Sequence, residues 1–584
     1  MKNDYIVRKT YYSFVLVSIL SSLTATAGML IDNIIVGRYL GSEALGAMGI
    51  VGPVSLVFSA IGNICSGGGG ARAAQALGRG ERDRFSLIFT VNMLFVLAIG
   101  TLLTVLGVLY TPAIAILLGA KDTLLTPATD YLYGFFLGTI PTILLSAMMC
   151  FVRIDGSPKL PLVCICVMSA ANIVLDLMMV HVFHLGMFGM ALATTISYVL
   201  AVSTALTHFL KKDSTLKLVR PKGFFKDLSQ TFLTGFPTAI SRISDTCKVM
   251  LLNHMLVTYI SVAAVTALNV RTTVSNFLGA VVLGIGQAAT PTIGMFFGEE
   301  DRTAVKDTLK TTLRLGLAMN SVLGIVLLLF PSFFAGLLGV TDGNLMSMSV
   351  MAIRLFGIGM PLQLINSALL NYYQCTKKVG MATMICLLQS LVYTVMFAFI
   401  LIQPMGATGV WLAFLIGEIL TILTVGLVLC IRNGKFAISF DTILMLDSQF
   451  GGDPKDKLEL SIGNSMEEVM LISSGIYKFG RNRRINAETL NMLSLCIEEM
   501  AGNVVRHAFK PGEKRWLDLT IVDKPEMLIL RIRDNGAAFD PLAYLSTGTG
   551  EGFGILIIQK LAENIDYRRS MGLNNLIIHL KKSE

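Results

Sequence analysis

The feature that most constrains the fold is a repeat, at an offset of 220 residues, within the apolar part of the chain. Four matches share that offset without gaps: Leu117-Leu118-Gly119 with Leu337-Leu338-Gly339, Pro141 with Pro361, Gly186–Gly189 with Gly406–Gly409, and Gly78 with Gly298. A repeat of this length inside apolar sequence is typical of duplicated transport folds, in which the substrate path runs between the copies. The sequence therefore predicts two related helical halves, and the repeat ends before about residue 436.

The composition indicates that most of the chain lies in a membrane. Of its 584 residues, 54% are hydrophobic and 15% are charged, and the mean hydropathy is +0.69. A soluble protein does not have this balance, and apolar stretches of about 20 residues, long enough to cross a bilayer, recur along the first three quarters. We expect twelve spans, near 11–36, 45–71, 85–109, 129–152, 160–181, 185–210, 228–256, 262–290, 310–332, 348–372, 380–402 and 406–431.

Charge is distributed unevenly along the chain. The first 435 residues carry 29 basic and 18 acidic side chains, whereas residues 436–584 carry 18 and 20. The basic excess gathers in alternate short loops, which is the pattern of the positive-inside rule and not that of a nucleic-acid-binding surface. We therefore expect a multi-pass protein of the plasma membrane with both termini in the cytoplasm, and no nucleic-acid partner.

These features divide the chain into three parts. Residues 1–435 form the membrane part, with an N-lobe of about 1–215 and a C-lobe of about 222–435, and residues 436–456 form a linker. Residues 457–584 are predicted to form an α/β domain. Its expected strands lie near 457–463, 515–522, 527–533 and 574–582, and its expected helices near 465–480, 487–508 and 554–564.

Polar residues inside the predicted spans are candidates for function, because a charge in hydrocarbon costs about 2.5–3.5 kcal/mol on insertion scales. The first half contains Asp32 in span one and Asp176 in span five, with Asn172 one helical turn before Asp176 on the same face. Thr194 in span six can add a hydroxyl. Two carboxylates, an amide and a hydroxyl suit a proton or a hard cation such as Na⁺. The alternative is a structural polar network between helices.

The motifs around these residues resemble a known family. Asp32-Asn-Ile-Ile-Val-Gly37, Asn172-Ile-Val-Leu-Asp176 and Gly186-Met-Phe-Gly189-Met-Ala-Leu-Ala-Thr194 are similar to those of the multidrug and toxic compound extrusion (MATE) transporters, and the likeness covers about residues 8–432. The resemblance implies two six-helix lobes, alternating access, and export of organic or drug-like compounds in exchange for H⁺ or Na⁺. It also implies that Asp32, Asn172, Asp176 and Thr194 form the coupling-ion cluster.

The second half carries more charge within its spans. Arg242, Asp245 and Lys248 lie in span seven, Arg271 in span eight, Arg354 in span ten and Glu418 in span twelve. The spacing of Arg242 and Asp245 predicts a salt bridge within one helix. Glu418 is a candidate second cation site, and Gln287, Asn366 and Gln389 are candidates to line the cavity. The basic residues would repel a cationic substrate.

Three motifs in the C-terminal part point to nucleotide binding. In Glu498-Glu499-Met-Ala-Gly-Asn503, Glu499 and Asn503 share a helix face, so a carboxylate base and an amide ligand for Mg²⁺ point the same way. Asp534 and Gly536 follow a predicted strand, where the carboxylate can accept from an adenine amino group and the glycine lets the base approach. The glycines of the third motif lead into a helix whose N-terminus suits phosphates, and they are Gly548, Gly550, Gly552 and Gly554.

Together these motifs resemble the GHKL ATP-binding fold, an α/β sandwich, and most closely the serine kinases that act as anti-sigma factors. By that resemblance Glu499 is the base-like catalytic residue, Asn503 holds Mg²⁺, Asp534 contacts adenine, and the glycines of 548–554 form the lid. No histidine occurs between residues 436 and 506, so a sensor kinase's phosphoacceptor is missing there. The leading interpretation is an antiporter with a cytosolic domain that binds ATP and Mg²⁺ for regulation or signalling. The alternative is a membrane sensor whose C-terminal domain is a Ser/Thr kinase acting on a cytosolic partner.

Overall fold

A computed structural model describes residues 4–121, 124–211, 214–341, 343–434, 439–447, 449–509, 513, 515–540 and 553–582. The chain divides into two compact units. The membrane unit comprises Ser13–Glu299 and Thr308–Leu444. The C-terminal unit comprises Met1–Tyr12, Glu300–Asp307 and Met445–Glu584.

The membrane unit is helical. Among the described residues, nine helices or continuous helical runs are long and apolar enough to cross a membrane, or ten if α6 and α7, which meet at 51°, form one span. The α-helices of its first half are α1 (Tyr5–Ile35), α2 (Gly41–Asn63), α3 (Gly70–Gly78), α4 (Arg82–Leu109), α5 (Thr111–Leu117), α6 (Leu125–Leu137), α7 (Thr139–Ile154), α8 (Leu160–His181) and α9 (Gly186–Leu206). Those of its second half are α10 (Phe224–Tyr259), α11 (Val262–Gly298), α12 (Arg302–Leu329), α13 (Pro331–Leu337), α14 (Gly343–Cys375), α15 (Val379–Leu387), α16 (Tyr393–Asn433) and α17 (Phe440–Leu444).

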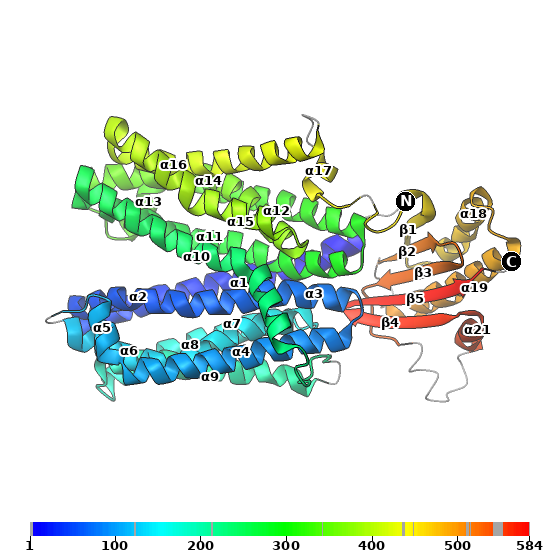
Figure 1. The fold of residues 1–584 in the computed structure, drawn as a ribbon, viewed down its shortest axis with the longest axis horizontal. Coiled ribbons are helices and arrows are strands. Elements are labelled where there is room, and N and C mark those ends of the chain that lie inside the picture. Colours follow the sequence, from blue (N-terminus) through cyan, green and yellow to red (C-terminus); the bar gives the residue numbers. More distant parts are fainter. Residues whose placement is uncertain are drawn as a thin grey trace. The chain divides into compact units, whose positions relative to one another are not determined.

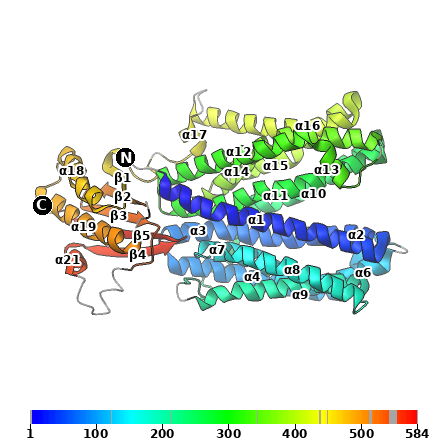
Figure 2. The ribbon, with the colours of Figure 1, turned by 180° about the vertical axis from the view of Figure 1, so that it is seen from behind.

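Short turns of other helical types join several of these helices. They are the π-helical segments η1 (Val36–Leu40), η2 (Ile64–Gly69) and η5 (Leu388–Val392), and the 3₁₀ turn η4 (Thr207–Leu210). Helices α1–α9 gather in one bundle and α10–α16 in a second (Figures 1 and 2). Large apolar side chains cover their outer faces: Leu423, Leu427 and Ile431, one turn apart on α16, are each more than half exposed. Such a surface requires hydrocarbon around it.

The two bundles approach closely where α3 contacts α11. A methyl group on Gly78 would collide with the backbone carbonyl of Met295, and one on Gly298 would collide with that of Gln75. The absence of side chains at these two glycines therefore permits backbone-to-backbone packing between the halves.

The C-terminal unit contains a five-stranded antiparallel sheet with strand order β1-β2-β3-β5-β4. Its strands are β1 (Lys457–Gly463), β2 (Trp516–Asp523), β3 (Met527–Asp534), β4 (Asn564–Ser570) and β5 (Leu573–Lys581). Its helical elements are α18 (Met466–Asn482), α19 (Ala487–Asn503), α21 (Phe553–Leu561), the short 3₁₀ turn η6 (Pro454–Asp456) and the π-helical segment η7 (Val504–Ala508). Strand β4 was not predicted, and the helix before it ends at Leu561, before the predicted 564.

Alternating side chains give this sheet one apolar face, because successive residues of a strand point to opposite sides. Leu519 pairs with Ile532, and Leu530 pairs with Ile578, in register. These residues are buried, and α18 and α19 lie on one face of the sheet (Figures 1 and 2). Ser465 begins α18 by accepting from the Glu468 N–H, and the Glu468 carboxylate accepts from the Gly463 N–H. This exchange resembles a capping box and fixes where the helix starts.

Candidate transport and nucleotide sites

The first candidate site lies between α1 and α8. The Asn172 side-chain amide donates to Asp32 Oδ1 at 2.8 Å and to Asp176 Oδ2 at 2.7 Å. Asp176 is fully buried, Asn172 is 7% exposed, and Asp32 is half-buried. The other oxygen of Asp176, Oδ1, has no hydrogen-bond partner among the described residues. Three of the four residues predicted to form one cluster therefore lie together, with a buried carboxylate oxygen available to a further ligand.

Thr194, the fourth predicted member, lies on α9. Its hydroxyl donates to the Met190 carbonyl of its own helix at 3.1 Å. This bond within the helix occupies the hydroxyl hydrogen, so any contribution of Thr194 to a cation site would come from its oxygen lone pairs.

A cavity of about 480 Å³ lies mainly among the helices of the second half. Five charged residues line it: Arg242, Asp245, Lys248, Arg271 and Glu418. Lys248 donates to Asp245 at 2.8 Å. Asp245 therefore forms its ion pair with Lys248, whereas the spacing had predicted one with Arg242. The Arg271 guanidinium stacks on the Phe414 ring, 3.6 Å from its centroid.

The other polar residues predicted near this cavity have distinct positions. Glu418 accepts from the Asn366 amide at 2.7 Å and from the Gln389 amide at 3.1 Å. Gln389 and Glu418 line the cavity itself, whereas Asn366 supports Glu418. Gln287 does not line this cavity, and both its side-chain oxygen and its backbone carbonyl accept from Arg153, at 3.4 and 3.2 Å. Glu418 is thus held by two amide donors at the cavity wall.

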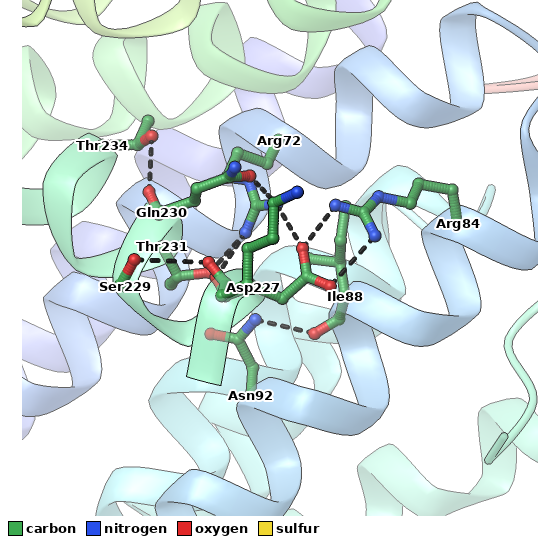
Figure 3. Close-up of polar contacts among 10 residues, drawn as sticks. Arg72, Arg84, Ile88, Asn92, Asp227, Ser229, Gln230, Thr231 and Thr234 are labelled. Carbon is green, nitrogen blue, oxygen red and sulfur yellow. Dashed lines mark hydrogen bonds and ion pairs between the residues drawn. The ribbon is translucent and has the colours of Figure 1, made fainter. Parts of the chain in front are cut away.

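A cluster that the sequence did not reveal joins the two halves (Figure 3). Asp227, at the start of α10, is buried and receives two guanidinium groups, Arg72 from α3 and Arg84 from α4. Arg72 donates to Asp227 Oδ1 at 2.7 Å, to Gln230 at 2.7 Å and to Thr231 at 2.9 Å, while Arg84 donates to Asp227 Oδ2 at 2.9 Å. The three charged residues lie at the edges of predicted spans, where sequence alone suggests solvated loop charges.

In the C-terminal unit, Asp534 lies at the end of β3 and is 2% exposed. One carboxylate oxygen accepts from the Gly536 N–H at 2.7 Å and from the Asn574 amide at 2.8 Å. Burial raises the pKa of Asp534 above its usual range, although these two bonds and the charge of Arg569 act in the opposite direction. Asn574 accepts in turn from Arg569 at 2.6 Å and from the Tyr567 hydroxyl at 2.8 Å. The network therefore fixes the orientation of the Asp534 carboxylate.

Asn574, Arg569 and Tyr567 were absent from the predicted site. The available signal was Asn574-Asn575 within a strand, since two consecutive buried asparagines are unusual where one face must be apolar. Arg569 belongs to β4, the strand that was not predicted.

Glu499 and Asn503 lie on α19, on the side that faces Asp534 and the start of α21. Asn503 lines a small pocket together with Asp534, Phe539 and Asn574. The Glu499 carboxylate lies against Gly554, where a side chain would collide with it. Gly548, Gly550 and Gly552 lie outside the described residues. The structure thus brings Asn503 and Asp534 to one pocket and Glu499 beside the first turn of α21.

Comparison with known proteins decides the family of the membrane unit. The family model described as MatE matches residues 18–178 and 237–400, more than half of the chain. The chain belongs to the MatE family. A second model, described as a histidine kinase-like ATPase domain, matches residues 464–580 of this MatE protein. The C-terminal domain is therefore called the ATPase domain below.

Curated relatives and solved structures cover the membrane part of this MatE chain. Multidrug export protein MepA of Staphylococcus haemolyticus is 24% identical over 428 residues, covering 73% of this chain and 94% of that protein. MepA of Staphylococcus aureus strain MRSA252 is 23% identical, covering 75% and 97%. An outward-facing MATE family transporter has a TM-score of 0.67 at 19% identity, covering 72% and 94%. A mutant of the Vibrio cholerae MATE transporter VcmN has a TM-score of 0.68 at 18% identity, covering 72% and 95%. These structures share the fold.

The ATPase domain implies that this MatE protein binds ATP, and the donor set agrees with that ligand. The pocket is lined by apolar side chains around a buried carboxylate, which suits a flat base that has one amino group to donate. The Asn503 amide supplies an oxygen of the kind that Mg²⁺ accepts. Met500 and Phe539 are among the side chains that line the pocket, whose volume is about 30 Å³.

Proposed function

We propose that the protein is a secondary antiporter that exports organic or drug-like compounds in exchange for H⁺ or Na⁺, with an ATP-binding domain that regulates it. The proposal rests on the cluster in which the Asn172 amide donates to both Asp32 and Asp176. Two carboxyl groups inside an apolar helical unit are costly unless they are used. The MepA relatives, named as multidrug export proteins, support the class of substrate.

The cluster is suited to hold one cation at a time. The two carboxyl groups carry up to two negative charges, and Asn172 neutralises neither of them, since an amide donates without charge. A proton or Na⁺ at Asp32 and the free Oδ1 of Asp176 would remove part of this charge. The bound and empty states then differ electrostatically, and that difference can favour opposite-facing conformations of the two halves.

We further propose twelve spans arranged as two six-helix lobes. Helix α10 adds an eleventh span to the ten, because its 36 residues are long enough to cross although its charges lower its hydropathy. The run from Val379 to Asn433 is 55 residues long, far more than one bilayer needs. Its backbone leaves helical geometry at Gly406, where φ is 58°. That break supports two spans. The basic loops support cytoplasmic termini.

For the ATPase domain we propose that Asp534 accepts from the adenine amino group and that Asn503 ligates Mg²⁺ on the phosphates. Glu499 acts as the base-like residue, Gly536 lets the base approach, and Gly548, Gly550, Gly552 and Gly554 close over the nucleotide. The groups over which these glycines close are the phosphates of ATP. A second candidate function is that of a Ser/Thr kinase acting on a cytosolic partner, in which Glu499, beside Gly554 at the start of α21, would serve as the base.

Measuring substrate export from proteoliposomes tests the transport proposal. Vesicles of full-length protein are given an inward H⁺ or Na⁺ gradient, with and without ATP, and export of a fluorescent organic substrate is followed. The expected result is flux that depends on one of the two gradients and vanishes in Asp32→Asn. Asp130→Asn, which changes an exposed aspartate on α6, is the matched control. Flux that needs ATP but neither gradient would contradict the proposal.

A further inference from the structure

The cavity of the second half has a charge pattern that the coupling cluster does not explain. Its lining contains three basic residues and two acidic ones. We propose that this cavity binds compounds that carry an anionic group, a carboxylate, sulfonate or phosphate, and that the Arg271 guanidinium receives that group. This inference rests on the proposed transport function and names the class of compound carried.

Arg271 is the central observation. Its side chain lines the cavity, yet the residue is only 8% exposed. Among the residues that the structure describes, none accepts a hydrogen bond from its guanidinium, and no carboxylate lies in ion-pair contact with it. Burying a charged group whose N–H donors have no acceptor is strongly unfavourable. The arrangement is explained if a ligand brings the acceptor that these donors lack.

The carboxylates of the same cavity are already engaged. Glu418 is held by the amides of Asn366 and Gln389 at 2.7 and 3.1 Å. Asp245 accepts from Lys248 at 2.8 Å. The charge of Glu418 acts on Arg271, but neither acid makes an ion-pair contact with it. With three basic and two acidic residues, the cavity keeps an excess of positive charge. A compound whose head group is only cationic would be repelled by it.

Two aromatic rings lie close to the guanidinium, and Phe414 is near enough to stack on it. The Cζ atom of Arg271 lies 3.6 Å from the centroid of Phe414 and 5.3 Å from that of Phe356. Stacking uses the flat face of the guanidinium and leaves its edge of N–H donors unengaged. That edge matches a carboxylate or a related oxyanion in two parallel hydrogen bonds.

The cavity also has room for the rest of such a molecule. Its volume of about 480 Å³ lies within the usual range for drug-sized ligands, about 300–1,000 Å³. Leu355, Leu370 and Leu415 contribute apolar wall next to the charged residues. The site therefore suits an aromatic or aliphatic body that bears an anionic group at one end.

Equilibrium binding tests the inference without any gradient. Full-length protein in lipid nanodiscs is titrated calorimetrically with 2-naphthoate, 2-naphthamide and 2-naphthylmethylammonium, and empty nanodiscs serve as the blank. These probes share one ring system and differ in head-group charge. The expected affinity of the carboxylate exceeds that of the amide by about 10- to 100-fold, as for a charge-assisted pair. Equal or tighter binding of the ammonium by the unaltered protein would overturn the inference, whether or not any variant folds.

Variants assign the effect to one side chain. Arg271→Gln should lose most of the carboxylate preference, while naphthamide binding stays unchanged. Arg354→Gln removes an exposed arginine of α14 that does not line the cavity, and it should behave as the unaltered protein. A carboxylate affinity that survives Arg271→Gln would reject the assignment. Carboxylate binding without gradient-driven flux would contradict the transport proposal alone, whereas Asp32-dependent flux without carboxylate preference would contradict this inference alone.

Discussion

Arg72 on α3 donates to Asp227 on α10 at 2.7 Å, across 155 residues of sequence and between the two halves of the membrane unit. Arg84 shares the same carboxylate. Asp227 is 3% exposed, so its charge depends on these two partners for compensation. The pair therefore helps to hold α10 against α3 and α4 in the conformation described here.

Asp227→Asn should loosen that contact. Removing one partner of a buried ion pair costs about 3–5 kcal/mol. Helix η2, which carries the fully buried Cys65, packs on α10 at the same place, where Gly235 faces the Ile64 carbonyl. The rate at which N-ethylmaleimide labels Cys65, followed by mass spectrometry, should rise at least about 10-fold. Cys164, buried on α8, is the internal reference, and Asp83→Asn, at an exposed acid, is the control. Equal labelling rates would refute the role of the pair.

Asp32→Asn and Asp176→Asn should each abolish gradient-driven export while the protein remains folded and inserted. Each substitution removes a charge that a coupling ion would need. Thr194→Ala should reduce export much less, because its hydroxyl is already bonded to Met190. Initial flux rates in proteoliposomes measure all three variants. Normal flux in both aspartate variants would rule out the coupling assignment, and a complete loss in Thr194→Ala would place that hydroxyl in the cluster.

Two substitutions in the ATPase domain should separate recognition of the base from recognition of the metal. Asp534→Ala should weaken ATP binding by at least about 10-fold with or without Mg²⁺, because a buried charged acceptor is lost. Asn503→Ala should weaken it only when Mg²⁺ is present. Calorimetric titration of full-length protein with and without EDTA measures both, and Glu526→Ala, an exposed acid before β3, is the control. Superimposable curves would mean that the motifs do not bind nucleotide.

Recognition of adenine should depend on pH at values above those at which an ordinary aspartate titrates, about 3.9. The folded-state pKa of Asp534 is raised by burial, so its ionisation opposes folding as the pH rises through that pKa. The ionised carboxylate is the form that accepts from the amino group, so affinity should fall as the pH falls through the same pKa. Adenosine is the appropriate ligand because it lacks titrating phosphates. A matching pH dependence in Asp534→Asn would exclude this carboxylate as the cause.

Truncation after residue 435 should leave gradient-driven export measurable, with altered rate or regulation. The coupling cluster and both halves lie before that position, and alternating access needs no further part. Flux measurements on the truncated and the full-length protein check this. If Glu499→Ala stops export as completely as Asp32→Asn does, the ATPase domain is part of the transport mechanism.

Sequence reasoning succeeded where a local pattern carries the information. Asn172 and Asp176 share a helix face at any packing, so their proximity could be predicted. The order of the first two nucleotide motifs likewise predicted a common site for Asn503 and Asp534, which line one pocket. The Arg72–Asp227 contact could not be predicted, because it depends on how α10 packs against α3. Lys248 and Arg242 both lie three residues from Asp245, and only the packed rotamers select Lys248. Strand β4 was missed because Asp566, Arg568 and Arg569 interrupt its apolar alternation.

The glycine contact between α3 and α11 has a consequence for the origin of the molecule. Gly78 meets the carbonyl of Met295, and Gly298 meets the carbonyl of Gln75. Gly78 and Gly298 are related by the offset of 220 residues, and so are Gln75 and Met295. Each half thus presents to the other the same patch that it receives, which is the geometry of an isologous interface in a two-fold symmetric homodimer. We infer that the single chain preserves the interface of an ancestral dimer whose subunits became joined end to end.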